Sequence, residues 1–163
     1  MKPINREYLR SVLFGIENSL ISTVGLIAGI SVGVDNKRVV ILGASVAIVI
    51  EAVAMGVGEY LSDDAVQELD KIKRHPENPL LSGLLMMVSG SLAGLIPLAP
   101  VIVLDYPGSL YFSVLFALIG LFILGYTKGK ILRTSPWRGG LKILIVGGLA
   151  TTLGLVVGLI FRV

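Results

Sequence analysis

Five apolar stretches dominate this chain, and each is long enough to cross a lipid bilayer. A helix needs ~20 mostly apolar residues to span the hydrocarbon core. Within lipid every backbone polar group must be satisfied inside the segment, which a single α-helix achieves. The sequence therefore predicts an all-α membrane protein, a single domain over residues 1–163. Its five transmembrane helices are expected at about residues 9–33, 39–61, 80–104, 109–127 and 139–161.

The composition agrees with a membrane protein. Of the 163 residues, 54% are hydrophobic and 15% are charged, whereas soluble domains are about one quarter charged. The chain has no cysteine, which excludes disulfides and thiolate metal sites. We expect an integral, multi-pass protein whose first partner is the bilayer, in the cell membrane if the chain is prokaryotic.

Two segments interrupt the apolar pattern in informative ways. Residues 62–78 are polar, and Pro76 and Pro79 stop any helix that enters them. We predict a short cytoplasmic helical extension of the second span there. In the third span, Pro97 and Pro100 are expected to bend or fray the distal end.

The distribution of positive charge predicts the orientation. With the N-terminus in the cytoplasm, only Lys37, Arg38 and Arg162 of the 14 Lys and Arg residues lie on the outer side. Cytoplasmic segments carry the excess of Lys and Arg in membrane proteins. The N-terminus is therefore expected to be cytoplasmic and the C-terminus to lie on the opposite side. Because the net charge of +3 is explained by topology, we expect no nucleic-acid partner.

The acidic residues inside the apolar spans are the clearest functional signal. They are Glu17, Glu51 and Glu59, and an ionisable residue within a membrane span is costly enough to indicate a functional site. Glu51, Met55 and Glu59 are four residues apart and share one helix face. At ~1.5 Å per residue, antiparallel neighbours would bring Glu17 and Asn18 level with Glu51 and Met55, and would leave Glu59 near the cytoplasmic end.

This set of side chains suits a transition-metal ion. Carboxylate and amide oxygens bind Mn²⁺ and Fe²⁺, and a thioether favours softer transition metals over Mg²⁺ or Ca²⁺. Without a cysteine or a histidine inside a span, binding should be weak and exchangeable, as transport requires. Metal entry among buried carboxylates would also displace protons.

We therefore predict a pathway for a transported Fe²⁺ or Mn²⁺ ion, with protons moving in exchange and no permanently bound cofactor. Its expected residues are Glu17, Asn18, Glu51, Met55 and Glu59. An acidic cytoplasmic entry at Asp63, Asp64 and Glu68 is a further expectation.

Other interpretations remain open for the same residues. Glu59 is close enough to the interface to reach water, Glu17 could pair with a neighbouring helix, and the acidic patch could be a solvated helical face. On that basis the chain would be a non-transporting assembly or interaction module. An enzyme is not expected, because the spans contain no histidine and no nucleophile–base pair. Gly25, Gly29 and Gly33 have the four-residue spacing of helix-packing glycines.

Three motifs resemble the vacuolar iron transporter family. The segment Phe14-Gly15-Ile-Glu-Asn18-Ser19-Leu20 is similar to that family's first-helix pattern, Phe-Gly-x-x-Asp-Gly-Leu. The segment Met55-Gly-Val-Gly-Glu59-Tyr60 is similar to its second-helix Met-x-x-Gly-Glu-Tyr/Phe, and residues 94–100 resemble its Gly-x-x-x-Pro-Leu-x-Pro.

The resemblance implies a five-helix fold and a homodimer whose conduction path lies at the dimer interface, lined by the first helix. It also implies export of cytosolic Fe²⁺, often also Mn²⁺, in exchange for protons. By position, Asn18 takes the place of the family's aspartate, while Met55 and Glu59 match its methionine and glutamate. Ala54 replaces the usual serine, and the family's glutamate-rich cytoplasmic domain is reduced here to residues 62–78, as in a minimal member.

Overall fold

Five helices make up the part of the chain that the computed structural model describes, residues 6–69 and 78–162. They are α1 (Arg6–Gly33), α2 (Lys37–Leu69), α3 (Pro79–Val103), α4 (Ser109–Ile131) and α5 (Pro136–Ile160). All five are long and apolar enough to cross a membrane, and the described residues contain no strand. The predicted all-α, five-span fold is confirmed, and the protein is an integral multi-pass membrane protein. Its orientation in the membrane stays a prediction.

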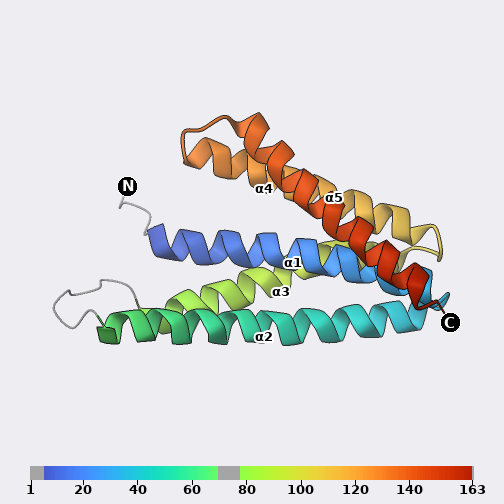
Figure 1. Ribbon diagram of the computed structural model, residues 1–163, viewed down its shortest axis with the longest axis horizontal. Coiled ribbons are helices and arrows are strands. Elements are labelled where there is room, and N and C mark those ends of the chain that lie inside the picture. Colours follow the sequence, from blue (N-terminus) through green and yellow to red (C-terminus); the bar gives the residue numbers. More distant parts are fainter. Residues whose placement is uncertain (1–5, 70–77, 163) are drawn as a thin grey trace.

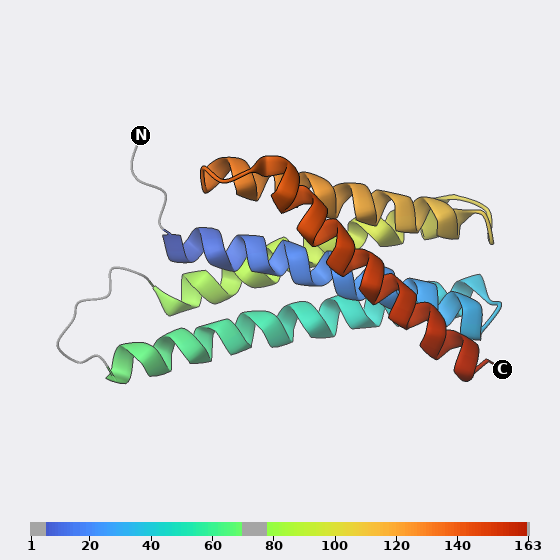
Figure 2. The same ribbon diagram turned by 45° about the horizontal axis from the view of Figure 1, so that its top comes forward.

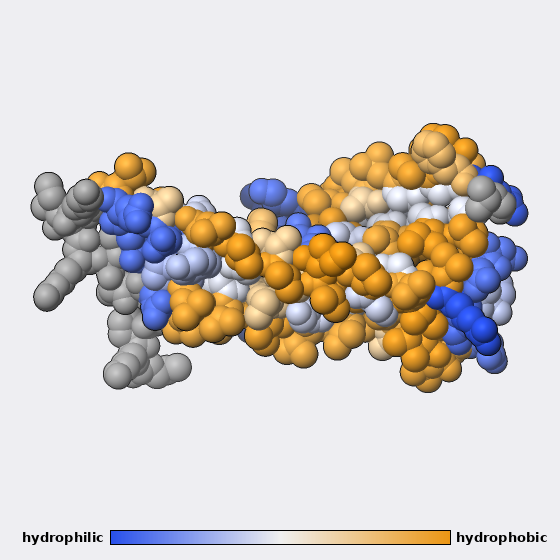
Figure 3. Space-filling model, turned by 90° about the horizontal axis from the view of Figure 1, so that it is seen from below, coloured by the Kyte–Doolittle hydropathy of each residue, from blue (hydrophilic) through white to orange (hydrophobic). Residues whose placement is uncertain are grey.

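Helix α1 is the central element of the bundle, because it packs against each of the other four helices. Successive helices run in opposite directions, so the start of α1 and the end of α5 lie at opposite ends of the molecule (Figure 1). Helix α2 lies on one side of α1, α4 and α5 lie on the other, and α3 crosses α1 from the α2 side toward α4 (Figures 1 and 2). The surface in Figure 3 is largely hydrophobic along its length, with hydrophilic residues at both ends and in a smaller group near the middle of the upper edge.

The helices differ from the expected spans in three places. Helix α2 continues to Leu69, through the first part of the predicted extension, and residues 70–77 lie outside the described residues. Helix α4 continues to Ile131, so Lys128 is helical rather than part of a connector. The expected fraying of α3 is wrong, since the helix runs through Pro97 and Pro100 to Val103. The Ser113 hydroxyl of α4 donates to the Pro97 carbonyl at 2.6 Å, which ties α4 to α3 beside the proline.

Glycines allow α1 and α5 to cross at backbone contact. A Cβ atom added at Gly25 would lie 3.0 Å from the Ala150 carbonyl oxygen, and one at Gly29 would lie 2.8 Å from that of Gly154. From the α5 side, a Cβ at Gly154 would overlap the Gly25 carbonyl. The stripe of Gly25, Gly29 and Gly33 thus lies where α1 meets α5, and any side chain there would push the helices apart.

The end of the bundle that holds the α1–α2 turn is closed by polar contacts between turns. The Lys37 ammonium donates to the carbonyls of Ile102 at 3.2 Å and Leu104 at 2.8 Å, which would otherwise be unsatisfied at the end of α3. The Tyr106 hydroxyl donates to the Ser31 carbonyl at 3.1 Å. Burial raises the pKa of Tyr106, and the neighbouring Asp35 raises it further.

A pair of glycine substitutions on α5 tests this packing. We expect Gly154→Ala to lower the thermal midpoint of unfolding in detergent, because overpacking of a tight contact costs ~1–3 kcal/mol. Gly148→Ala is the matched control, since no atom lies within 4 Å of its added Cβ. It should leave the midpoint unchanged or raise it, because alanine is the better helix former. Circular dichroism measures both unfolding midpoints. If the midpoints of the two variants are equal, the α1–α5 crossing is not tight.

Candidate functional site

Four side chains from α1 and α2 meet midway along the bundle, and we refer to them as the deep cluster. They are Asn18 and Ser22 of α1 and Glu51 and Met55 of α2. The Asn18 amide Nδ2 donates to Glu51 Oε1 at 2.9 Å and lies 3.0 Å from the Met55 sulfur. The Ser22 hydroxyl donates to Glu51 Oε2 at 2.5 Å. The expectation that Asn18 lies level with Glu51 and Met55 agrees with this geometry.

The deep cluster provides hydrogen-bond donors for a carboxylate placed within a membrane span. Both oxygens of Glu51 receive a hydrogen bond, one from Asn18 and one from Ser22. Leaving such a group unpaired in an apolar environment costs several kcal/mol or drives its protonation. All four side chains are half-buried rather than sealed off, so an ion could reach them from outside the helix bundle.

A second group, the mouth cluster, lies ~12 Å further along α2, two helical turns from Glu51. It consists of Arg10 and Ser11 of α1 with Glu59 and Asp63 of α2. The Ser11 hydroxyl donates to Glu59 Oε1 at 2.7 Å, and Arg10 Nη2 lies 2.9 Å from the same oxygen. Arg10 Nη2 is also 3.5 Å from Asp63 Oδ1. Glu59 is 9% exposed, so this glutamate is held by α1 rather than extended into solvent.

Asn18 occupies the position that a cation would need in the deep cluster. Its nitrogen lies within 3.0 Å of both a Glu51 oxygen and the Met55 sulfur, which are the two ligands a metal ion would contact. An amide carries an acceptor oxygen beside its nitrogen. Rotation of the amide by half a turn would direct that oxygen toward the site and give a carboxylate, an amide oxygen and a thioether. Among the described residues no three His, Asp or Glu side chains converge in a metal-binding arrangement.

Glu17 does not join these residues. It lies ~100° around α1 from Asn18, and its carboxylate pairs with Lys128 of α4 at 3.2 Å. This is the contact expected if Glu17 serves as a partner for a neighbouring helix. Glu17 therefore faces α4 rather than α2, because adjacent helix positions face different neighbours. Its place in the pathway stays a prediction.

The expected acidic entry is only partly assembled. Asp63 faces Arg10 in the mouth cluster. Asp64 is half-buried and Glu68 is exposed further along α2. A cation that approached Asp63 would compete with the Arg10 guanidinium for the carboxylate.

Three residues of the two clusters were not foreseen from the sequence: Arg10, Ser11 and Ser22. A signal for the serines was present, because Ser11, Asn18 and Ser22 are spaced by seven and four residues, which places them on one helix face. No comparable signal existed for Arg10, because a basic residue at the start of a span is ordinarily an orientation signal.

The sequence also matches known proteins. A model of the VIT family matches residues 9–75 and 65–159. The chain belongs to the VIT family. It is 26% identical over 159 residues to vacuolar iron transporter homolog 1 of Arabidopsis thaliana, covering 88% of this chain and 78% of that protein. It is 31% identical over 85 residues to vacuolar iron transporter 1 of the same plant, covering 52% of this chain and 34% of that protein. The family resemblance seen in the motifs is thus confirmed.

A double-mutant cycle tests the contact between α1 and α2. Asn18→Leu alone should lower thermal stability in detergent, because it leaves Glu51 Oε1 without its donor, at a cost of ~1–3 kcal/mol. In a Glu51→Leu background the same change should cost little, because no carboxylate remains to be satisfied. If Asn18→Leu costs the same in both backgrounds, the two side chains do not interact.

Proposed function

We propose that this protein transports a divalent transition metal, Fe²⁺ or Mn²⁺, out of the cytosol in exchange for protons. Membership in the VIT family supports metal transport, and the relatives are named as iron transporters. The observation that carries the proposal for this chain is the deep cluster, where a carboxylate and a thioether from α2 face one amide of α1. Carboxylate, amide oxygen and thioether together suit Fe²⁺ and Mn²⁺ better than Mg²⁺.

The two clusters suggest an order of events. The ion first meets Glu59 and Asp63, where it displaces the Arg10 guanidinium from the carboxylates. It then moves ~12 Å along α2 to Glu51 and Met55, and the Asn18 amide rotates to offer its oxygen. A proton bound to either glutamate leaves as the metal arrives, because the charges of the proton and the metal compete for the same oxygens. Such competition couples metal flow to proton flow in opposite directions.

A second copy of the chain would complete the site. One protomer supplies a carboxylate, an amide and a thioether at the deep cluster, whereas Mn²⁺ and Fe²⁺ in oxygen-rich sites usually take ~6 ligands. A two-fold axis that brings two deep clusters together doubles the donor set. We therefore include a homodimer in the proposal, with the half-buried α1–α2 face toward the axis.

One observation favours a different function, that of a non-transporting membrane module. Both oxygens of Glu51 are already satisfied by α1, which is what a purely structural buried acid would require. The two functions differ in what Glu51→Gln should change. Loss of metal flux in a folded protein supports transport, and loss of folding supports the structural role.

A matched pair of glutamate variants tests the proposed pathway. In proteoliposomes loaded with a metal-sensitive dye, Glu51→Gln should reduce Mn²⁺ or Fe²⁺ uptake by about tenfold or more, which corresponds to ~1.4 kcal/mol. Glu17→Gln is the control, because it makes the same chemical change one helix face away, beside Lys128. It should retain most of the flux. A pH-sensitive dye on the side of the membrane opposite to the metal-sensitive dye should report proton movement. This proton movement should decrease in any variant whose metal flux decreases.

The result that contradicts the pathway is wild-type flux in Glu51→Gln, or equal losses in the two variants. Equal losses would place Glu17 in the pathway after all or show that both changes damage the fold. Gel filtration of each variant separates those two explanations.

Asn18→Asp provides an independent test at the same cluster. The aspartate adds a negative charge and removes the amide hydrogens that hold Glu51 and Met55. We expect it to tighten Mn²⁺ binding by about tenfold or more, ~1.4 kcal/mol, as measured by metal-dependent thermal stabilisation or calorimetry. Unchanged affinity would show that the ion does not bind beside residue 18.

A further inference from the structure

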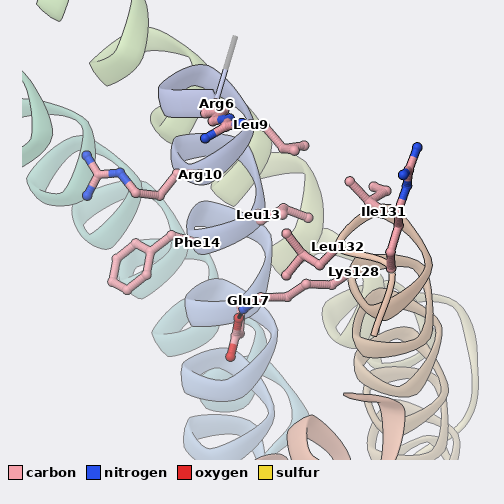
Figure 4. A pocket seen from close by; sticks show the side chains of 10 residues that line it. Arg6, Leu9, Arg10, Leu13, Phe14, Glu17, Lys128, Ile131 and Leu132 are labelled. Carbon is pink, nitrogen blue, oxygen red and sulfur yellow. Dashed lines mark hydrogen bonds and ion pairs between the residues drawn. The ribbon is translucent and has the colours of Figure 1, made fainter. Parts of the chain in front are cut away.

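A cavity of about 640 Å³ lies on the other side of α1 from the deep cluster, between the first half of α1 and the end of α4 (Figure 4). Its walls combine charged and apolar side chains. The basic residues are Arg6, Arg10, Lys128 and Arg133, and the acidic residue is Glu17. The apolar residues are Leu9, Leu13, Phe14, Ile131 and Leu132. In Figure 4, Lys128 reaches from α4 toward Glu17, and Arg10 points away from α4.

The cavity carries an excess of positive charge. Lys128 is neutralised by Glu17, and Arg10 is engaged by Glu7, Glu59 and Asp63. Among the described residues no carboxylate forms an ion pair with Arg6 or Arg133. These two arginines stand on opposite walls, one at the start of α1 and the other just past the end of α4. An anion in the cavity would therefore meet two guanidinium groups that no carboxylate of the described residues pairs with.

The backbone at Arg133 provides a second observation. Its φ of 55° lies in the left-handed region, which L-residues other than glycine adopt only at a cost. The Arg133 amide donates to the Lys130 carbonyl and the Thr134 amide to that of Gly129. These are the two hydrogen bonds of a Schellman motif, whose left-handed position normally belongs to glycine. Glycine would fit this left-handed position with less backbone strain. We therefore attribute the presence of an arginine here to a role of its side chain rather than to the geometry of the turn.

The position of the cavity in the membrane follows from nearby aromatic residues. Trp137, at the start of α5, contacts the rings of Phe122 and Tyr126 with centroids 5.6 and 5.9 Å away. Its side chain is 69% exposed. Exposed tryptophan and tyrosine gather at the level of the lipid headgroups. Arg133 and Leu132 of the cavity lining lie four and five residues before Trp137 along the chain, so we place this part of the cavity at the level of the lipid phosphate groups.

We propose that this cavity binds the headgroup of an anionic phospholipid. Arg6 and Arg133 hold the phosphate from opposite sides, and an acyl chain lies against the apolar wall of Leu13, Phe14 and Leu132. Basic pockets between membrane helices on the cytoplasmic side are suited to anionic headgroups. The five apolar residues favour a lipid over a free phosphate ion, because only a lipid has acyl chains that can pack against them. The bound lipid would bridge α1 and α4 where the helices diverge (Figure 1).

Lipid binding to the purified, full-length protein in detergent tests the proposal. Native mass spectrometry should show phosphatidylglycerol bound more tightly than phosphatidylcholine with the same acyl chains. Arg133→Gly and Arg6→Gln should each weaken phosphatidylglycerol binding by about fivefold, and together by about 30-fold, as expected for arginines near an anionic headgroup. The thermal midpoint of Arg133→Gly without lipid should equal or exceed that of the wild type, because glycine relieves the left-handed backbone. Weak binding would then not be due to a damaged fold.

Arg138→Gln is the matched control, since Arg138 is an exposed arginine of the first turn of α5 that does not line the cavity. It should change phosphatidylglycerol affinity by less than about twofold, because a charge outside the site contributes only through a screened field. The proposal is overturned if Arg138→Gln weakens binding as much as Arg133→Gly, or if phosphatidylcholine binds equally well. It is also overturned if inorganic phosphate binds as tightly as phosphatidylglycerol. A change of oligomeric state in Arg133→Gly would assign the cavity to a second copy of the chain instead.

Discussion

A carboxylate within a membrane span has to be satisfied by protein, and Glu51 sets this requirement for the bundle. Within an apolar span, each of its oxygens needs a hydrogen-bond donor from a neighbouring helix. Asn18 and Ser22 of α1 supply one hydrogen bond each. This fixes the register of α1 against α2, and with it the position of Met55 beside Asn18. The same register brings Ser11 and Arg10 to Glu59 two turns further along.

The central position of α1 explains how one helix can serve several neighbours. Its glycines allow α5 to approach at backbone contact, while its polar residues face α2. Asn18 and Glu17 are adjacent in sequence, yet one faces Glu51 and the other faces Lys128. The chemistry on the two sides is correspondingly different: the α2 side gathers carboxylate, amide and thioether groups, and the α4 side gathers guanidinium groups around a cavity. If both proposals hold, helix α1 separates a cation site from an anion site.

Much of the fold could be predicted from the sequence, because a membrane restricts a spanning segment to few secondary structures. The five apolar stretches form five helices, and a constant rise per residue predicts that Asn18 lies level with Glu51. Rotation about the helix axis was harder to predict. Glu17 and Asn18 have the same depth, but only the packing of α1 against four neighbours decides which of them faces α2. Arg10 could not be assigned to Glu59, since long side chains at a helix end reach partners that spacing alone does not identify.

The most direct test of a cation site on α1 and α2 is anomalous scattering from crystals soaked in Mn²⁺ or Fe²⁺. The proposed transport predicts a peak in contact with Glu51 and Met55, with the Asn18 amide rotated so that its oxygen faces the ion. Crystals of Asn18→Asp should show a stronger peak at the same place. A metal peak confined to the acidic residues beyond Glu59, with Asn18 still donating to Glu51, would contradict a metal site in the deep cluster.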